Sequence, residues 1–372
     1  MSADTSILFT PFDLGGHRLK NRFVMPAMTR GRAPASGVPS ALNALYYAQR
    51  ATAGLVIGEG TNPTPGGCGF PGVPCVYTPE HGEGWRKVAD AVHAAGGTLF
   101  LQLWHGGRVS SAAWQPDGRA PLGASAVKAE GALMMTPDGQ RGEPDVPREA
   151  THAEIAWLVE GFAKAARTAI DAGVDGVEIH GANGYLVHQF LSDRSNVRTD
   201  RYGGAPGNRI RFPLEVAEAI VAEIGAARTG IRISPLAAYQ DAPVSDPEAV
   251  YPLLLKELDR LNLVYVHCVE GEPGGINRGW DAEARTFDFK AARRMFKGAW
   301  IANNGYDPVR AAAAINAQDT DLVSFGRPFL SNPDYPERVR RGAPLNDIDP
   351  PTAYAGNGEA GYTDYPVLEM AE

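Results

Sequence analysis

Eight short apolar segments, spread along the chain of 372 residues, restrict its fold more than any other sequence feature. Each is nearly continuous rather than alternating in polarity, which is typical of strands whose two faces are both buried. Longer stretches with the 3.6-residue spacing of amphipathic helices lie between most of them. The segments are 23–28, 55–59, 99–104, 176–180, 231–235, 263–269, 299–302 and 322–325.

The stretches between these segments carry helix signals. The expected helix starts are Thr78-Pro79, Thr151, Asp246-Pro247 and Asp307-Pro308. Thr151 is followed by Glu154 at the spacing of a capping box. Proline suits the first turn because the N–H that it lacks would have no partner there. Another helix is expected over 208–224, where Pro213 must lie near the first turn or kink the helix.

Strand and helix signals together predict a single α/β domain over 1–372, a closed parallel (β/α)8 TIM barrel. A doubly wound open sheet is the structural alternative, but it should show G-x-G-x-x-G after an early strand, and the sequence has none. The connection 105–150 follows the third segment and is rich in Gly, Pro and Ser. Because so long a connection is usually functional or disordered, we expect a lid or hairpin excursion over the catalytic end. The tail from Pro350 is expected beside the same end.

Composition argues against several classes of function. The net charge is −8 and no basic stripe is present, so neither nucleic acid nor an anionic membrane is an expected partner. No apolar run reaches the roughly 18 residues of a membrane span, and the first ten residues lack a secretory pattern. The cysteines, Cys68, Cys75 and Cys268, form no C-x-x-C pair, which favours a cytoplasmic protein without metal, iron–sulfur or disulfide sites.

Polar side chains gather where the predicted strands end, and barrel enzymes draw catalytic groups from those ends. The set comprises Thr29, Arg30, Glu59, Gly60, Thr61, Gln102, Trp104, His105, His180, Asn183, Tyr185, Arg232, Asn303, Asn304, Gly305, Gly326 and Arg327. His180 and Asn183 can both donate to one ligand oxygen and polarise a carbonyl, while the Tyr185 phenol can deliver a proton. A core histidine beside a turn asparagine is the alternative interpretation.

Two other strands carry groups suited to a flat cofactor. Arg232 lies between two isoleucines, so its charge must be paired or must face a functional cavity. An ion pair with Glu59 or Glu178 is the alternative. Gln102 and Trp104 point to the same side of their strand, where an amide and an indole suit a heterocycle, although Trp more often packs in a core.

The last two strands end in loops that could bind phosphate. Asn304-Gly305 and Gly326-Arg327 supply glycine backbone and one fixed cation, which suit an anion at a barrel mouth. A glycine turn and a surface arginine would look the same in the sequence.

The motifs taken together resemble the old yellow enzyme family of FMN-dependent ene-reductases over nearly the whole chain. The matching strings are LFTP (8–11), KNR (20–22), AMTR (27–30), QLWHGGR (102–108), HGANGYL (180–186), QFLS (189–192), RYGG (201–204), SFGRP (324–328) and GYTDYP (361–366). Thr29, where another branch has Cys, indicates the classical branch. Phe70 stands where many relatives have Tyr, and Asn183 where some have His.

The resemblance implies that FMN lies across the barrel mouth. Arg232 would stabilise the anionic reduced flavin, Gln102 would bind its pyrimidine edge, and Thr29 would bind its C4 carbonyl. The other implied FMN contacts are Ala27, Met28 and Gly60 beside the ring, and Asn304, Gly305, Gly326 and Arg327 at the phosphate.

The resemblance also implies the reaction. NADPH or NADH would reduce FMN, as in an NADPH dehydrogenase, and flavin N5 would pass a hydride to an α,β-unsaturated carbonyl, maleimide or nitroalkene. His180 and Asn183 would hold the activating oxygen of this alkene, and Tyr185 would protonate its α-carbon. The residues implied to shape the substrate pocket are Trp104, Phe70 and Tyr354, beside His180 and Asn183. A monomer or homodimer is expected.

Two other functions compete with this reading of the sequence. A flavin-free, phosphate-binding barrel acting as an isomerase or aldolase would need a base at a strand end, for which only Glu59 and Glu270 qualify. A non-catalytic flavin sensor would not need the combination of His180, Asn183 and Tyr185.

Overall fold

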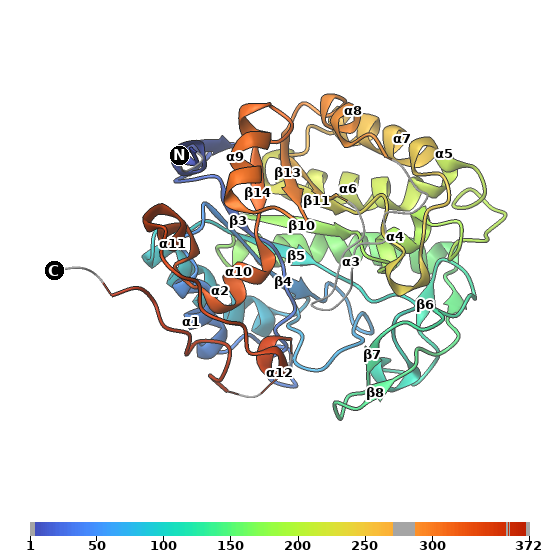
Figure 1. The fold of residues 1–372 in the computed structure, drawn as a ribbon. Helices are drawn as coiled ribbons and strands as arrows, with labels where there is room; N and C mark the ends of the chain where they lie inside the picture. Colours follow the sequence, from blue (N-terminus) through green and yellow to red (C-terminus); the bar gives the residue numbers. More distant parts are fainter. Residues whose placement is uncertain (1–3, 271–286, 355, 357, 370–372) are drawn as a thin grey trace.

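Eight parallel strands close into a barrel, which confirms the predicted (β/α)8 architecture. The computed structural model describes residues 4–270, 287–354, 356 and 358–369 (Figure 1). The barrel strands, in spatial order, are β3 (Phe23–Met25), β4 (Leu55–Thr61), β5 (Leu99–Leu103), β10 (Gly176–Gly181), β11 (Thr229–Ile233), β12 (Tyr265–Val269), β13 (Ala299–Asn303) and β14 (Leu322–Ser324). Pairing of β14 with β3 closes the ring.

All eight expected segments contain a strand, although several strand ends differ from the expectation. The first strand ends at Met25 rather than at residue 28, because Pro26 has no N–H to donate to a neighbouring strand. The sixth begins at Tyr265 rather than at residue 263, although Leu263 and Val264 are buried beside it.

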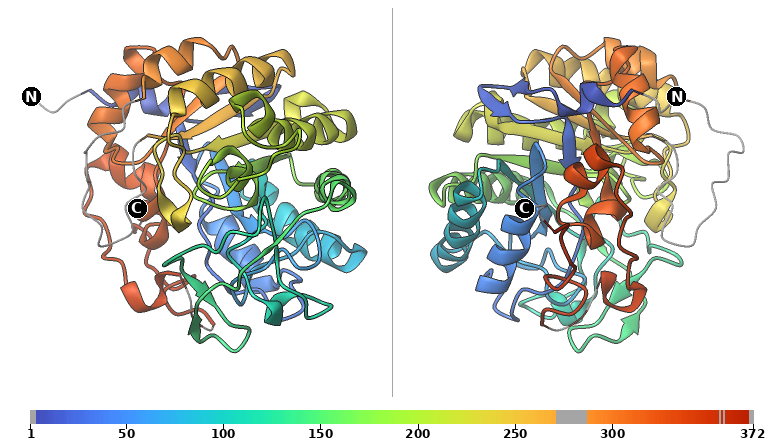
Figure 2. Two further views of the ribbon diagram at one scale, coloured as in Figure 1. Left: turned by 90° about the vertical axis from the view of Figure 1, so that its right-hand side faces the viewer. Right: turned by 60° about the vertical axis from the view of Figure 1, so that its left-hand side comes forward.

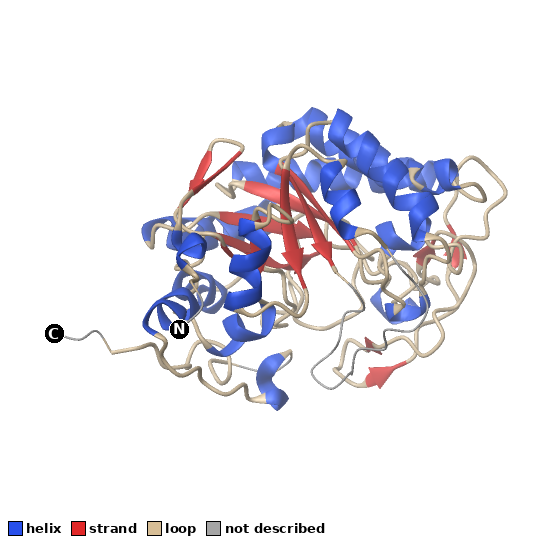
Figure 3. Ribbon diagram, turned by 45° about the horizontal axis from the view of Figure 1, so that its top comes forward, coloured by secondary structure: helices blue, strands red, loops and turns tan. Residues whose placement is uncertain are grey.

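Helices surround the strands (Figure 3). They are α1 (Ala41–Gln49), α2 (Pro79–Ala94), α3 (His152–Asp171), α4 (Leu186–Leu191), α5 (Pro206–Arg209), α6 (Arg211–Ile224), α7 (Pro247–Arg260), α8 (Phe289–Arg294), α9 (Pro308–Asn316), α10 (Gly326–Ser331), α11 (Tyr335–Arg341) and α12 (Pro350–Ala353). Among the described residues, no helix combines the length and apolar character that a bilayer crossing requires.

The predicted helix starts are confirmed in atomic detail. Thr151 accepts a hydrogen bond from the Glu154 N–H, and the Glu154 carboxylate accepts one from the Thr151 N–H in return. The expected helix over 208–224 is instead divided at Ile210 into α5 and α6. Pro213 is the third residue of α6, where its missing N–H costs nothing.

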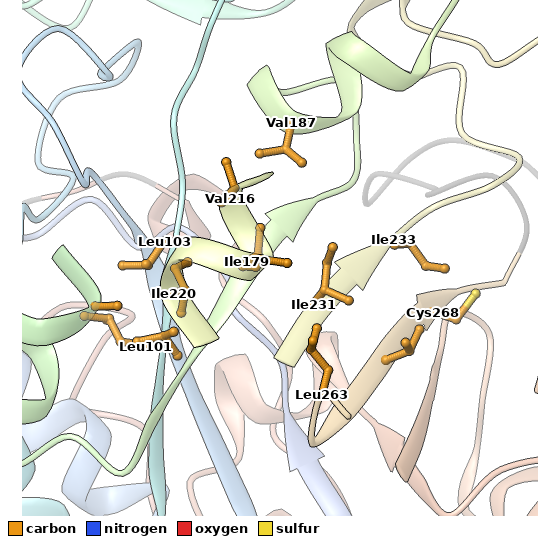
Figure 4. Close-up of a cluster of buried hydrophobic side chains, with 14 of the residues drawn as sticks. Leu101, Leu103, Ile179, Val187, Val216, Ile220, Ile231, Ile233, Leu263 and Cys268 are labelled. Atoms are coloured by element: carbon orange, nitrogen blue, oxygen red, sulfur yellow. The ribbon is translucent and has the colours of Figure 1, made fainter. Parts of the chain in front are cut away.

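Successive side chains along each strand point alternately outward, toward the helices, and inward, toward the barrel axis. Leu101, Leu103, Ile179 and Ile231 face outward and pack with the helices in the main core (Figure 4). The intervening residues face the barrel axis. Near the amino ends of the strands these are apolar, including Leu55, Ile57, Phe100, Tyr265, Ile301 and Leu322. The hairpin of β1 (Phe12–Leu14) and β2 (His17–Leu19) contributes Leu14 and Leu19 to this inner cluster.

The excursion over 105–150, for which we expect a lid or hairpin, contains a short hairpin and no α-helix. Strands β7 (Met134–Met135) and β8 (Arg141–Gly142) pair antiparallel, while β6 (Leu122–Gly123) pairs with β9 (Arg148–Glu149) in parallel. Figure 2 shows this hairpin and α12 of the tail side by side. Met135 of the hairpin and Tyr354, directly after α12, line one groove, so the tail lies beside the same end of the barrel, as predicted.

Candidate active site

A small cavity of about 150 Å³ opens at the carboxyl ends of the strands. Its lining comprises Ala27, Thr29, Gly60, Gln102, Trp104, His180, Asn183, Tyr185, Arg232 and Tyr239. The sequence predicted every one of these site residues except Tyr239. Five strands and the loops that follow them therefore bring the predicted residues together at one point.

His180, Asn183 and Tyr185 converge on this cavity from β10 and the turn after it. Asn183 has a left-handed backbone (φ 56°), held by a 2.8 Å hydrogen bond from its N–H to Ser234 Oγ. The Tyr185 ring lies 5.4 Å from the His180 ring and 5.1 Å from that of Trp104. His180 Nδ1 and Asn183 Oδ1 are buried without a hydrogen-bond partner among the described residues, which indicates a site prepared for a polar ligand.

The electrostatics keep both ionisable members of this group neutral. Burial, followed by the charge of Arg232, holds the pKa of His180 well below its ordinary value. Burial also raises the pKa of Tyr185 above its ordinary value, against a hydrogen bond from Gln240 that lowers it. At neutral pH the site therefore offers a neutral imidazole and a protonated phenol.

A buried polar network lies inside the barrel at the level of the cavity. The carboxylate of Glu178 accepts 2.7 Å from Gln102 Nε2 and contacts His267 Nδ1 at 2.8 Å. His267 Nε2 contacts Ser324 Oγ at 2.8 Å, and Ser324 Oγ accepts from Asn303 Nδ2 at 2.7 Å. Glu178 and His267 are completely buried. The network therefore joins five strands, β5, β10, β12, β13 and β14, and it includes the predicted flavin contact Gln102.

Arg232 completes this network and also faces the cavity. Its Nη2 donates 2.8 Å to Asn303 Oδ1, while its Nε and Nη1 are buried with no partner in the described part of the chain. No ion pair to Glu59 or Glu178 forms among these residues, so the alternative interpretation of Arg232 is not realised. Two unpaired donors of a buried cation require an acceptor that the described residues do not supply.

Glu59 and Glu270 are both engaged elsewhere. Glu59 accepts from the backbone N–H groups of Arg30 and Gly31 at 2.9 and 3.1 Å, and from the Tyr47 hydroxyl at 3.1 Å. Glu270 accepts from the Tyr306 hydroxyl at 2.6 Å. Neither carboxylate lines the small cavity, so neither is placed to serve there as the base of a flavin-free barrel enzyme.

The other predicted substrate contacts lie in a larger groove of about 890 Å³, which shares Thr29 with the cavity. Phe70 and Tyr354 line this groove, together with Met135 and Pro137 of the excursion. Phe70 lies 6.1 Å from the ring of Trp104, so this tryptophan stands between the two spaces.

The predicted phosphate loops lie just outside the cavity lining. Asn304 and Gly305 follow β13 with left-handed backbones (φ 85° and 73°). Gly326 begins α10, and a Cβ at this glycine would lie 3.4 Å from Met28 Sδ. The ends of β14 and β3 are thus adjacent, which brings the predicted ring and phosphate contacts near each other.

Two groups of polar residues were absent from the predicted site. His267 and Ser324 were not predicted, and Glu178 was considered only as an ion-pair partner. The sequence feature that could have indicated them is a polar residue at every second position of an apolar strand. Side chains at such positions point to the same face of the strand, which here faces the barrel axis. Tyr239 and Gln240 lie in the loop after β11, which carries no such pattern.

Comparison with known proteins agrees with the fold and the motifs. The family model for the NADH:flavin oxidoreductase / NADH oxidase family matches residues 7–346. A putative 12-oxophytodienoate reductase 5 of Oryza sativa subsp. japonica is 44% identical over 97% of this chain and 95% of its own length. The solved structure of morphinone reductase is 43% identical with a TM-score of 0.91, covering 99% of this chain and 98% of its own. The old yellow enzyme homologue from Zymomonas mobilis is 41% identical with a TM-score of 0.92, covering 97% and 99%.

Proposed function

The chain belongs to the NADH:flavin oxidoreductase / NADH oxidase family and is an FMN-dependent reductase of activated C=C bonds, and we propose here how its residues carry that activity. The proposed substrates are α,β-unsaturated carbonyls, maleimides and nitroalkenes. The proposed reductant is NADPH or NADH, as in an NADPH dehydrogenase, and a related morphinone reductase has been solved with tetrahydroNAD.

The cavity fits the isoalloxazine ring of FMN. Arg232 has two unpaired buried donors for the ring's carbonyl and N1 edge. Gln102 gives its amide N–H to Glu178, so the amide oxygen is left for a ring N–H. Thr29, Gly60, Ala27 and Met28 would border the ring. Asn304, Gly305, Gly326 and Arg327 would hold the phosphate. When bound, FMN supplies the hydride that the protein's own side chains cannot supply.

The chain's own residues then act on the alkene. His180 and Asn183 hold its carbonyl or nitro oxygen and stabilise the negative charge that develops there. Tyr185, kept protonated by burial, gives its proton to the α-carbon. Trp104, Phe70 and Tyr354 wall the space that the rest of the substrate occupies. The addition of the two hydrogens is proposed to be trans.

The observation that carries this assignment is the convergence of unpartnered buried polar atoms on one cavity. His180 Nδ1 and Arg232 Nε and Nη1 lack partners among the described residues, beside the Asn183 amide and the neutral phenol of Tyr185. A single domain, a cytoplasmic location and a monomer or homodimer complete the proposal. The three free cysteines Cys68, Cys75 and Cys268 favour that location.

An absorbance spectrum of the purified protein before and after anaerobic NADPH tests this function. We expect yellow flavin bands that bleach and then return when 2-cyclohexenone is added. Bands that return only with oxygen would contradict alkene reduction. A colourless protein that takes up no added FMN would overturn the cofactor.

A further inference from the structure

The side-chain amide of Gln240 lies against the hydroxyl of Tyr185. Its Nε2 donates to Tyr185 Oη at 3.4 Å, and the side chain is 5% exposed. Gln240 belongs to the loop after β11, next to Tyr239 in the cavity lining. It lies outside the lining itself, so it reaches the chemistry through another residue.

The backbone at this point is held in an unfavourable conformation. Gln240 and Asp241 are consecutive non-glycine residues in the left-handed region, with φ of 58° and 56°. A side chain in this region crowds its own backbone, so each such residue is strained. This strain is sustained only where surrounding contacts fix the conformation, and such sites are often functional.

Arg108 and Leu133 hold Gln240 from two directions. The completely buried Arg108 donates from Nη2 to the Gln240 carbonyl at 3.2 Å, and from Nη1 to the Lys128 carbonyl at 3.0 Å. The backbone N–H of Leu133, in the excursion, donates to Gln240 Oε1 at 3.0 Å. Gln240 Nε2 also donates to the Leu133 carbonyl at 3.4 Å, so the Leu133 backbone holds both ends of the amide while its nitrogen contacts Tyr185.

Gly184, the residue before Tyr185, leaves the space in which this loop packs. Gly184 has a left-handed backbone (φ 77°), and a Cβ there would lie 2.3 Å from the Tyr239 carbonyl oxygen and 2.7 Å from Gln240 Cβ. Any side chain at residue 184 would push the loop away from Tyr185. The glycine and the strained loop therefore form a matched pair.

A donor at the phenol oxygen has two chemical effects. It occupies a lone pair of Tyr185 Oη, so the O–H bond is directed elsewhere, toward the cavity. It also stabilises the phenolate that is left when the proton departs. We propose that Gln240 is a positioning residue for the proton donor Tyr185. The excursion would influence proton transfer because its Leu133 holds the Gln240 amide in place.

The proton transfer that Gln240 would assist is a step of the proposed function, on which this inference rests. The Oη–H bond of Tyr185 breaks, its proton forms the C–H bond at the α-carbon, and the electron pair remains on Oη beside the Gln240 amide. Solvent then returns a proton to the phenolate. The hydride of the same reduction comes from the established reductase activity.

The test uses Gln240→Asn, because Asn tolerates left-handed backbone but its amide is one carbon shorter. Gln318→Asn is the matched control. It replaces another left-handed glutamine (φ 62°), which is exposed and precedes β14 at the opposite end of the barrel. The NADPH-reduced holoenzyme is mixed anaerobically with 2-cyclohexenone, or with menadione, which needs no proton at carbon.

We expect Gln240→Asn to slow reoxidation by 2-cyclohexenone about tenfold, the value of one hydrogen bond of about 1.4 kcal/mol. Flavin reduction by NADPH and reoxidation by menadione should stay within a factor of two of the Gln318→Asn control. In a Tyr185→Phe background, Gln240→Asn should cause no further loss. An equal loss in that background, or a loss in all three reactions, would overturn the inference.

Gln240→Glu gives a second, independent readout. An ionised carboxylate can only accept, so it would draw the Tyr185 O–H away from the substrate, whereas a protonated carboxyl can donate as the amide does. The rate of this variant should therefore rise as the pH falls, and a pH profile like that of the wild type would contradict the inference. If wild-type reduced enzyme ignores 2-cyclohexenone, the proposed function fails. If the wild-type reduced enzyme reacts with 2-cyclohexenone and the Gln240 variants react at the same rate, the proposed function stands and this inference alone fails.

Discussion

Gln102 Nε2 donates a hydrogen bond of 2.7 Å to the carboxylate of Glu178, and this bond determines that the amide oxygen of Gln102 faces the cavity. Burial alone would raise the pKa of Glu178, but contact with His267, the charge of Arg232 and the Gln102 hydrogen bond together lower it below its ordinary value. Glu178 is therefore an ionised carboxylate beneath the cofactor site, balancing the charge of Arg232.

Replacing Glu178 by Gln should make the reduction potential of bound FMN more positive. The charge of Arg232 would lose its counter-charge, and reduction adds negative charge to the ring. A change of 1.4 kcal/mol corresponds to about 30 mV for a two-electron couple, so we expect a shift of about that size or more. An anaerobic spectroelectrochemical titration measures it, with the exposed Glu160→Gln as the control. An unchanged or more negative potential would contradict this role of Glu178.

The oxygen-binding role of Asn183 is tested by Asn183→Asp. Asp keeps the size and tolerates the left-handed backbone, but an ionised carboxylate cannot donate to the substrate oxygen. We expect kcat/KM for 2-cyclohexenone to fall about 10²–10³-fold, the usual loss for one donor at a developing oxyanion. Asn262→Asp is a matched control, because Asn262 is also left-handed (φ 54°) but exposed and remote from the cavity. Equal losses in the two variants would refute the assignment.

The sequence predicted the barrel and most of the cavity because both depend on local pattern. Buried strands are continuous apolar runs, and Thr29, Gln102, His180 and Arg232 interrupt or end them. Sequence alone could not show that Glu178 and His267 meet, because they are 89 residues apart and their contact depends on the order of strands around the ring.

The loop carrying Gln240 was beyond prediction for a different reason. Its path depends on two left-handed residues and on hydrogen bonds from Arg108, which is 132 residues away in the sequence. Gln gives no signal of such a backbone, and Asp gives a weaker signal than glycine would. The excursion was predicted from composition as a lid or hairpin, but its contact with this loop could be seen only in the structure.

Tyr362 anchors the tail that carries Tyr354. Its ring stacks on Tyr46 at 4.1 Å, and the guanidinium groups of Arg30 and Arg32 lie over it at 5.1 and 4.8 Å. Tyr362→Ala should lower the free energy of unfolding by about 3–5 kcal/mol, because it empties a fully buried aromatic site. Tyr362→Phe loses only the hydroxyl that accepts from Asn43 and should cost about 1 kcal/mol. Urea titrations compare the two variants, and similar losses would mean that the ring does not anchor the tail.

His105 should make the protein less stable in mild acid. Its side chain is buried, 4% exposed, and its Nδ1 accepts from the Gly107 N–H at 2.9 Å. Burial lowers its pKa from 6.5 to about 4. The unfolded chain therefore binds a proton at His105 below pH 6.5, whereas the folded chain binds it only near pH 4. The contribution of His105 to stability is complete above pH 6.5 and is lost as the pH falls from 6.5 to 4. The full loss from this residue is about 3 kcal/mol, and the lowered pKa values of His180 and His267 act in the same direction.

Urea titrations at pH 8 and pH 5 should show this decline in the wild type and a smaller one in His105→Asn, whose amide oxygen can replace the acceptor without titrating. An identical decline in both proteins would show that His105 is not its source.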